Sequence, residues 1–106
     1  MAETFEILEY TEAGRSPFAE WFDNLDAVTA ARVDRYVRRL EAGNFGAAKP
    51  LRDGVFELRL DFGPGYRVYY GREGRAIIIL LGGGSKRRQD ADIAAAVERW
   101  KRYKLR

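Results

Sequence analysis

The sequence contains no cysteine and no histidine. Without cysteine there are no disulfides and no thiolate nucleophiles, which fits a reducing compartment. Without both residues the usual zinc sites are excluded as well. The lack of histidine also removes the commonest general acid–base group near neutral pH. Any proton transfer must therefore come from carboxylates, tyrosines, lysines or the substrate itself.

Long hydrophobic runs and targeting segments are lacking too. The longest apolar run, Ala76 to Leu81, is far too short to cross a bilayer. The N-terminus is acidic and has neither the basic nor the apolar region of a signal peptide. No composition break or internal repeat divides the 106 residues. We therefore expect one domain, residues 1–106, in the cytoplasm and without membrane contact.

The charge of the chain is small in sum but unevenly placed. The net charge is +3, yet residues 1–48 hold nine acidic and five basic residues, whereas residues 49–106 hold seven acidic and fourteen basic ones. Fifteen of the nineteen cations are arginine, which favours planar, bidentate contact with phosphate or carboxylate. This asymmetry suits an acidic partner, namely RNA, DNA or an acidic protein segment. A merely solvated basic surface is the alternative.

Apolar periodicity and capping residues predict a small α+β domain. Ser16-Pro17 and Asp26 are typical helix starts, Gly43 is a typical helix end, and either Asp90 or Asp92 can cap the last helix. Residues 43–50 form the one loose connection. The predicted order is strand (4–10), helix (from 17), helix (from 26), three strands within 55–81, and helix (about 90–103).

Two of the predicted strands meet at Gly63-Pro64-Gly65, and their alternation separates an apolar from a polar face. The apolar face carries Phe56, Leu58, Leu60, Phe62, Tyr66, Val68 and Tyr70, and the polar face carries Arg59, Asp61, Arg67 and Tyr69. We expect the polar face to point away from the core and to hold anions. Arg67 can form an ion pair with Asp61, nearly opposite, or bind a phosphodiester, and both can hold.

A glycine-rich, cationic segment follows the last strand, Gly82-Gly83-Gly84-Ser85-Lys86-Arg87-Arg88. We predict a loop that leads into a helix and can cradle a phosphate. Its spacing is not that of a nucleotide-binding P-loop. Three cations at a helix N-terminus oppose the helix dipole, and a phosphate partner would explain them. Asp90 and Asp92 are more typical of caps than of metal ligands, so we expect no metal and no cofactor.

The pattern E-L-R-x-x-F-G-P-G-Y-R-V-Y-Y, then an aliphatic strand, G-G-x-x-K, and a closing helix with Trp100 resembles the RelE/ParE toxin superfamily. The closest likeness is to its HigB-like addiction module killer branch. The resemblance covers the whole chain in element order and residues 55–100 in residue pattern. It implies a mostly antiparallel, curved sheet with helices packed on one face.

The resemblance implies the toxin of a bacterial or phage-encoded type II toxin–antitoxin system. Such a toxin would be a metal-independent, ribosome-dependent mRNA endonuclease, neutralised by a cognate antitoxin, expected to be a helix-turn-helix protein. Two departures stand out. Glu57 occupies a position that is usually basic, and Asp90-Ala91-Asp92-Ile93 stands where relatives keep tyrosine or histidine.

The predicted site follows from this resemblance, residue by residue. Arg67 and Arg59 match residues that act on the phosphate, and Lys86 or Arg87 matches the cation after the last strand. We predict catalytic roles for Arg67, Lys86 and Arg59, RNA binding by Lys49, Arg52, Tyr69, Arg87 and Arg88, and proton transfer by Asp90, Asp92 or Tyr69. Two alternatives stay open: a non-catalytic ParE-like inhibitor of DNA gyrase, and a basic nucleic-acid-binding domain without toxicity.

Overall fold

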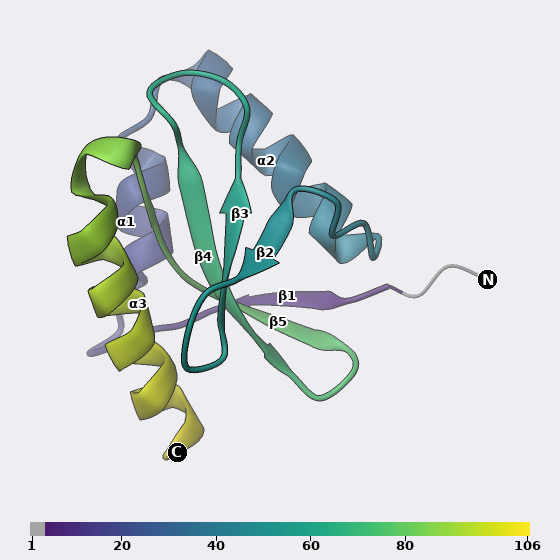
Figure 1. The fold of residues 1–106 in the computed structure, drawn as a ribbon, viewed down its shortest axis with the longest axis vertical. Helices are drawn as coiled ribbons and strands as arrows, with labels where there is room; N and C mark the ends of the chain where they lie inside the picture. Colours follow the sequence, from purple (N-terminus) through teal and green to yellow (C-terminus); the bar gives the residue numbers. More distant parts are fainter. Residues whose placement is uncertain (1–3) are drawn as a thin grey trace.

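The computed structural model describes residues 4–106, which form a five-stranded mixed sheet with three α-helices (Figure 1). The strand order is β1-β5-β4-β3-β2; β1 runs parallel to β5, and the other neighbours are antiparallel. The α+β class is therefore confirmed. The elements are β1 Glu6–Glu9, α1 Pro17–Asp23, α2 Ala27–Glu41, β2 Ala48–Pro50, β3 Val55–Arg59, β4 Arg67–Glu73, β5 Ile77–Gly84, a 3₁₀ turn η1 Lys86–Arg88 and α3 Gln89–Lys104.

Helices α1 and α2 cover one face of the sheet. The Ser16 side chain accepts a hydrogen bond from the Ala19 N–H (3.0 Å), Asp26 caps α2, and Gly43 at φ +82° ends it, all as predicted. The apolar face of the β3–β4 hairpin packs against these helices, which confirms its predicted alternation. The buried members of this core are Phe5, Phe18, Val33, Val37, Leu40, Leu58, Leu60, Val68, Tyr70, Ile78 and Leu80.

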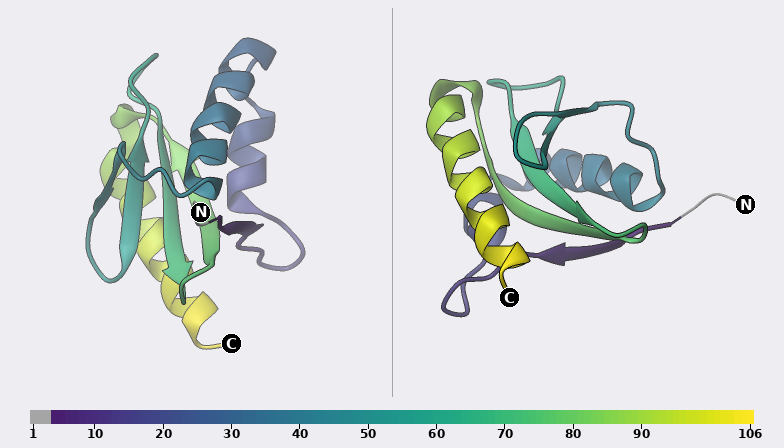
Figure 2. Two further views of the ribbon diagram at one scale, coloured as in Figure 1. Left: turned by 90° about the vertical axis from the view of Figure 1, so that its right-hand side faces the viewer. Right: turned by 60° about the horizontal axis from the view of Figure 1, so that its bottom comes forward.

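Helix α3 covers the opposite face, so the prediction of helices on one face only is wrong. Figure 2 shows α1 and α2 on one side of the sheet and α3 on the other. A second core lies beneath α3 and consists of Tyr10, Val55, Tyr69, Ile79, Leu81, Ala96, Val97 and Trp100. Gly71 makes room for this packing, since a Cβ there would come 2.5 Å from the Trp100 ring. The face of the β3–β4 hairpin that was predicted to be polar and solvent-exposed is therefore largely buried.

The glycines predicted to form a loop belong instead to the end of β5. Gly82, Gly83 and Gly84 pair with Tyr69, Val68 and Arg67 of β4. Leu81 is the extra residue of a bulge, and its carbonyl accepts a hydrogen bond from Arg99 Nη1 at 3.0 Å. The missing side chain at Gly83 lets Trp21 of α1 lie against the strand. These glycines serve close packing rather than an abrupt exit from the sheet.

The connection predicted over residues 43–50 contains the short strand β2, which pairs with β3 and so extends the sheet. None of the helices within residues 4–106 combines the length and the apolar character needed to cross a membrane.

Candidate functional site around the β3–β4 turn

The turn between β3 and β4 places two arginines side by side. Arg59, the last residue of β3, lies opposite Arg67, the first residue of β4. Like charges directly opposite each other on neighbouring strands are destabilising. A local anion has to offset them, and the structure supplies one inside the protein, the carboxylate of Glu57.

Arg67 is buried and paired with Glu57. The exposed fraction is 4% for Arg67 and 1% for Glu57. Arg67 Nε lies 2.8 Å from Glu57 Oε1, although its N–H is not aimed at that oxygen, so the contact is an ion pair rather than an aligned hydrogen bond. Arg67 Nη1 donates to the Gly65 carbonyl at 2.6 Å. The expected solvent-facing orientation of Arg67 is wrong, while its catalytic role stays a prediction.

The predicted ion pair between Arg67 and Asp61 is not formed. Asp61 instead accepts a hydrogen bond from the Tyr36 hydroxyl of α2. The cause is a register two residues away from the predicted one, because Arg67 lies opposite Arg59 rather than Asp61. A shift of two residues leaves every side chain on its predicted face but changes its partner.

Glu57 joins four elements of the structure. Besides its contact with Arg67 of β4, its Oε1 accepts a hydrogen bond from Gln89 Nε2 of α3 at 3.2 Å. Its Oε2 lies 3.6 Å from the ammonium of Lys49 on β2. The sequence contained a signal for this role, since Glu57 alternates onto the same face as Arg59. Glu57, which stands where the resemblance predicts a basic residue, thus organises this site.

Lys86 lies against the same turn. Its backbone N–H donates to the Pro64 carbonyl at 3.2 Å. Gly65 adopts φ +73°, and a Cβ there would come 2.9 Å from Lys86 Cβ and 3.0 Å from Arg67 Nη1. Only glycine suits this position. The fold therefore brings together Arg67, Arg59 and Lys86, as predicted from residues far apart in the chain.

Arg87 and Arg88 extend this group of cations. Both are exposed on the 3₁₀ turn η1, directly after Lys86. A cavity of about 400 Å³ borders the three cations and the first residues of α3. Hereafter the turn-side cluster denotes Arg59, Arg67, Lys86, Arg87 and Arg88. Four of its five members are exposed, so the cluster presents a cationic surface above a neutralised buried arginine.

The acidic residues at the start of α3 do not cap it. The helix begins at Gln89, its N-cap is Arg88 without a side-chain hydrogen bond, and Asp90 and Asp92 lie in the first turn. Asp92 packs against Gly84, where any side chain would collide with its carboxylate. Burial raises the pKa of Asp92, while the charges of Arg88 and Arg99 oppose this. Of the two carboxylates, Asp92 is half-buried beside the end of β5, whereas Asp90 is exposed.

Two predicted RNA-binding residues lie away from the accessible part of the site. Tyr69 is fully buried, so the prediction that it contacts RNA directly is wrong. Its pKa is raised by burial and by the negative charges of Glu57 and Asp92, and its hydroxyl has no hydrogen-bond partner within residues 4–106. Arg52 lies beside Asp53 (3.9 Å) before the start of β3, at the opposite end of that strand from the turn.

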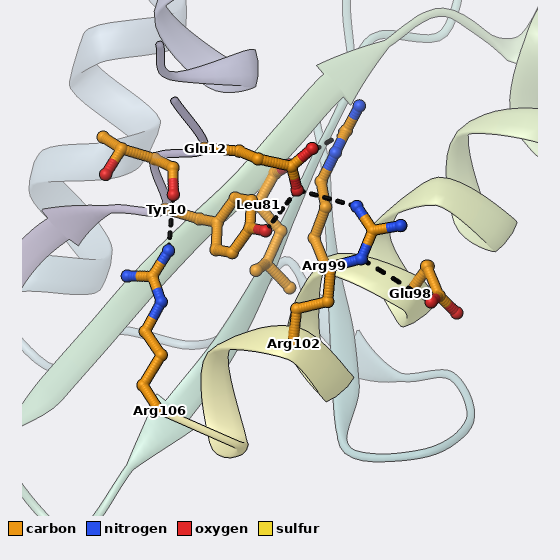
Figure 3. Close-up of polar contacts among 8 residues, drawn as sticks. Tyr10, Glu12, Leu81, Glu98, Arg99, Arg102 and Arg106 are labelled. Atoms are coloured by element: carbon orange, nitrogen blue, oxygen red, sulfur yellow. Dashed lines mark hydrogen bonds and ion pairs between the residues drawn. The ribbon is translucent and has the colours of Figure 1, made fainter. Parts of the chain in front are cut away.

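A separate polar network ties the β1–α1 connection to α3 (Figure 3). Glu12 Oε1 accepts hydrogen bonds from the Tyr10 hydroxyl and from Arg102 Nη1, each at 2.7 Å. A cavity of about 510 Å³ lies beside this network. Its lining contains none of the predicted site residues, and ion pairs join Arg15 to Glu20 and Arg102 to both Glu12 and Glu98. Internal pairing of this kind indicates a structural role.

Comparison with known proteins places the chain in a family. Residues 20–101 match the family described as phage derived protein Gp49-like (DUF891). A protein of Haemophilus influenzae (strain ATCC 51907 / DSM 11121 / KW20 / Rd), called an uncharacterized protein, is 45% identical over 80 residues, which cover 74% of this chain and 81% of that protein. The chain therefore belongs to the phage-derived Gp49-like family, a family associated with toxin–antitoxin systems.

Proposed function

We propose that this chain is a toxin of the RelE/ParE superfamily with HigB-like character, which cuts mRNA on the translating ribosome. The observation that carries the proposal is the convergence of Arg59, Lys86 and Arg67 on one turn. The toxin–antitoxin association of the family supports it. A cognate antitoxin, expected to be a helix-turn-helix protein, neutralises the toxin, and both act in the cytoplasm where ribosomes are found.

The chemistry in this proposal depends on charge and position. The ribose 2′-oxygen attacks the adjacent phosphorus, the bond to the 5′-oxygen breaks, and a 2′,3′-cyclic phosphate remains. Arg59 and Lys86 are exposed and stabilise the added negative charge of the pentacoordinate state. Arg67, held by Glu57, fixes the start of β4 beneath these exposed cations. Asp92, half-buried beside Gly84 at the end of β5, takes the proton from the 2′-hydroxyl, and the departing 5′-oxygen takes a proton from water.

A non-catalytic inhibitor of DNA gyrase is the second candidate function. It is favoured by the self-neutralised Glu57–Arg67 pair and by the burial of Tyr69, which leave few proton carriers near the turn. An inhibitor needs only a surface that binds its target, and the turn-side cluster can provide one without any proton transfer.

Inducible expression followed by mapping of mRNA 5′ ends separates these functions. The endonuclease should produce cuts within translated frames, and the Arg59→Ala and Lys86→Ala variants should lose both the cuts and the growth arrest. Arg75→Ala, an exposed arginine in the β4–β5 turn, is the matched control and should behave like the unaltered chain. Intact transcripts together with inhibited DNA supercoiling would refute the nuclease and support the gyrase inhibitor.

A further inference from the structure

A second cationic surface lies on α2, on the other side of the β3–β4 turn from Arg59 and Lys86. Arg32, Arg35 and Arg39 recur at helical spacing and are exposed. The ion pairs found among residues 4–106 include Arg38 of this helix, with Asp34 and Glu41, but none of these three arginines. Three neighbouring unpaired cations on one stripe repel each other and favour an external anion.

Aromatic rings hold two of these guanidinium groups in place. The Arg32 guanidinium lies 4.9 Å from the centre of the Phe62 ring, and that of Arg39 lies 4.5 Å from the centre of the Tyr36 ring. Stacking on a ring occupies the flat face of a guanidinium and leaves its N–H edge free for an oxygen anion. The rings reduce the freedom that the arginines lose when they bind a ligand.

A hollow of about 230 Å³ is bounded by the three arginines together with Tyr36, Asp61 and Phe62. Its one carboxylate, that of Asp61, already accepts a hydrogen bond from the Tyr36 hydroxyl. Three guanidinium groups thus face one engaged carboxylate, and the hollow retains a positive balance. We name Arg32, Arg35 and Arg39, with the rings of Tyr36 and Phe62, the α2 arginine surface.

The α2 arginine surface and the turn-side cluster flank the same short segment of chain. Phe62 lies in the connection between β3 and β4, which passes beside the start of α2 in Figure 1. It contacts Tyr36 and Arg32 on one side, while Arg59 at the start of this connection belongs to the opposite face of the sheet. A continuous chain of phosphates can neutralise both groups of cations at once by passing over this turn.

We propose that the α2 arginine surface binds the sugar–phosphate backbone of RNA outside the segment that is cut. The inference rests on the proposed RNA-directed function and adds to it a second contact that supplies affinity without reading sequence. Contacts of this type position a nucleic acid and depend strongly on salt. The surface therefore holds the RNA, and the turn-side cluster acts on it.

The test compares two triple variants that lose the same charge. Arg32→Gln/Arg35→Gln/Arg39→Gln removes the α2 arginine surface, whereas Arg75→Gln/Lys101→Gln/Lys104→Gln removes three exposed cations at the β4–β5 turn and the end of α3. Binding to a labelled, single-stranded, 2′-O-methylated RNA is measured by fluorescence anisotropy over a range of salt concentrations. This RNA lacks the 2′-hydroxyl and is not cleaved. Thermal unfolding checks that both variants fold.

The α2 variant should bind the RNA more weakly. The slope of its log binding constant against log salt concentration (the salt slope) should be smaller by about 2, since each of three lost phosphate contacts with a single strand contributes about 0.7. The control variant should keep a slope close to that of the unaltered chain. Equal slopes in the two variants overturn the inference. Equal slopes with a loss of antitoxin affinity also overturn it and assign the surface to a protein partner.

Cleavage mapping keeps this inference distinguishable from the proposed function. If the unaltered chain cuts transcripts but both variants have equal salt slopes for RNA binding, the proposed nuclease function stands and the RNA contact on α2 is refuted. An absence of cuts, combined with a reduced slope in the α2 variant alone, would leave the RNA-binding surface in place and remove the nuclease.

Discussion

The Arg67→Ala substitution should lower the free energy of unfolding much more than substitution of an exposed arginine would. The substitution leaves the Glu57 carboxylate at 1% exposure without its closest cation, with only the Gln89 amide at 3.2 Å and the largely exposed Lys49 ammonium at 3.6 Å. Removing one partner of a buried ion pair costs about 3–5 kcal/mol. An exposed pair is worth about 0–1 kcal/mol, so the two situations are clearly separated.

Urea unfolding followed by circular dichroism measures this cost. A loss of about 4 kcal/mol should lower the urea midpoint by about 2 M, given a slope of about 1–3 kcal/mol/M for small domains. The control is Arg38→Ala, which removes exposed ion pairs with Asp34 and Glu41 and should cost less than about 1 kcal/mol. Glu57→Leu/Arg67→Met removes both charges and should cost less than Arg67→Ala alone, because no buried charge is left unpaired.

Two results would refute the reasoning. A cost below about 1 kcal/mol for Arg67→Ala would mean that the Glu57–Arg67 pair behaves like a surface contact. A double variant as unstable as the sum of its single variants would show that the two side chains do not interact. The outcome also governs functional assays. A loss of toxicity in Arg67→Ala is meaningful only when the variant is shown to be folded under the assay conditions.

Three further predictions follow from local contacts. Gly83→Ala should destabilise the fold by about 1–3 kcal/mol, because the added Cβ collides with the Trp21 ring. Gly46→Ala is the control and should be nearly neutral. Thermal unfolding compares the two variants, and equal effects would contradict the prediction. Burial raises the pKa of Asp92, so its ionisation lowers the free energy of unfolding as pH rises above the ordinary value of 3.8. Asp92→Asn should therefore be more stable than the unaltered chain at neutral pH, and this difference in stability should vanish near pH 3. A difference that does not depend on pH would contradict the prediction. Ser16→Ala should cost about 1 kcal/mol through loss of the α1 cap, and an unchanged unfolding midpoint would argue against that role.

Much of the fold could be predicted because its signals are local. Capping residues marked both ends of α2, and alternation assigned Leu58 and Val68 to one buried face. The prediction that put all helices on one face of the sheet was wrong for α3. The run Ile77–Leu81 nevertheless indicates a helix on the other face, because a strand that is apolar at every position is buried on both faces. An alternating strand such as β3 does not carry this information.

The positions of the cations near the turn were predictable from the sequence, but their contacts were not. Arg59 and Lys86 were placed correctly near the turn, since strand order and turn position are enough for that. The pairing of Arg67 with Glu57 could not be derived, because it depends on the hairpin register and on how α3 covers the sheet. Both are decided by packing between distant segments rather than by local propensity.

The parallel pairing of β1 with β5 affects how the domain is made. Glu6 lies beside Ile77, 71 positions later in the chain, so β1 has no partner on its β5 side until β5 has been synthesised. At about 5–20 residues per second this delay lasts about 4–14 s. The segment with Lys86, Arg87 and Arg88 emerges later still, directly after β5. The proposed active surface therefore forms only after β5 has been synthesised, and the growing chain lacks it until then.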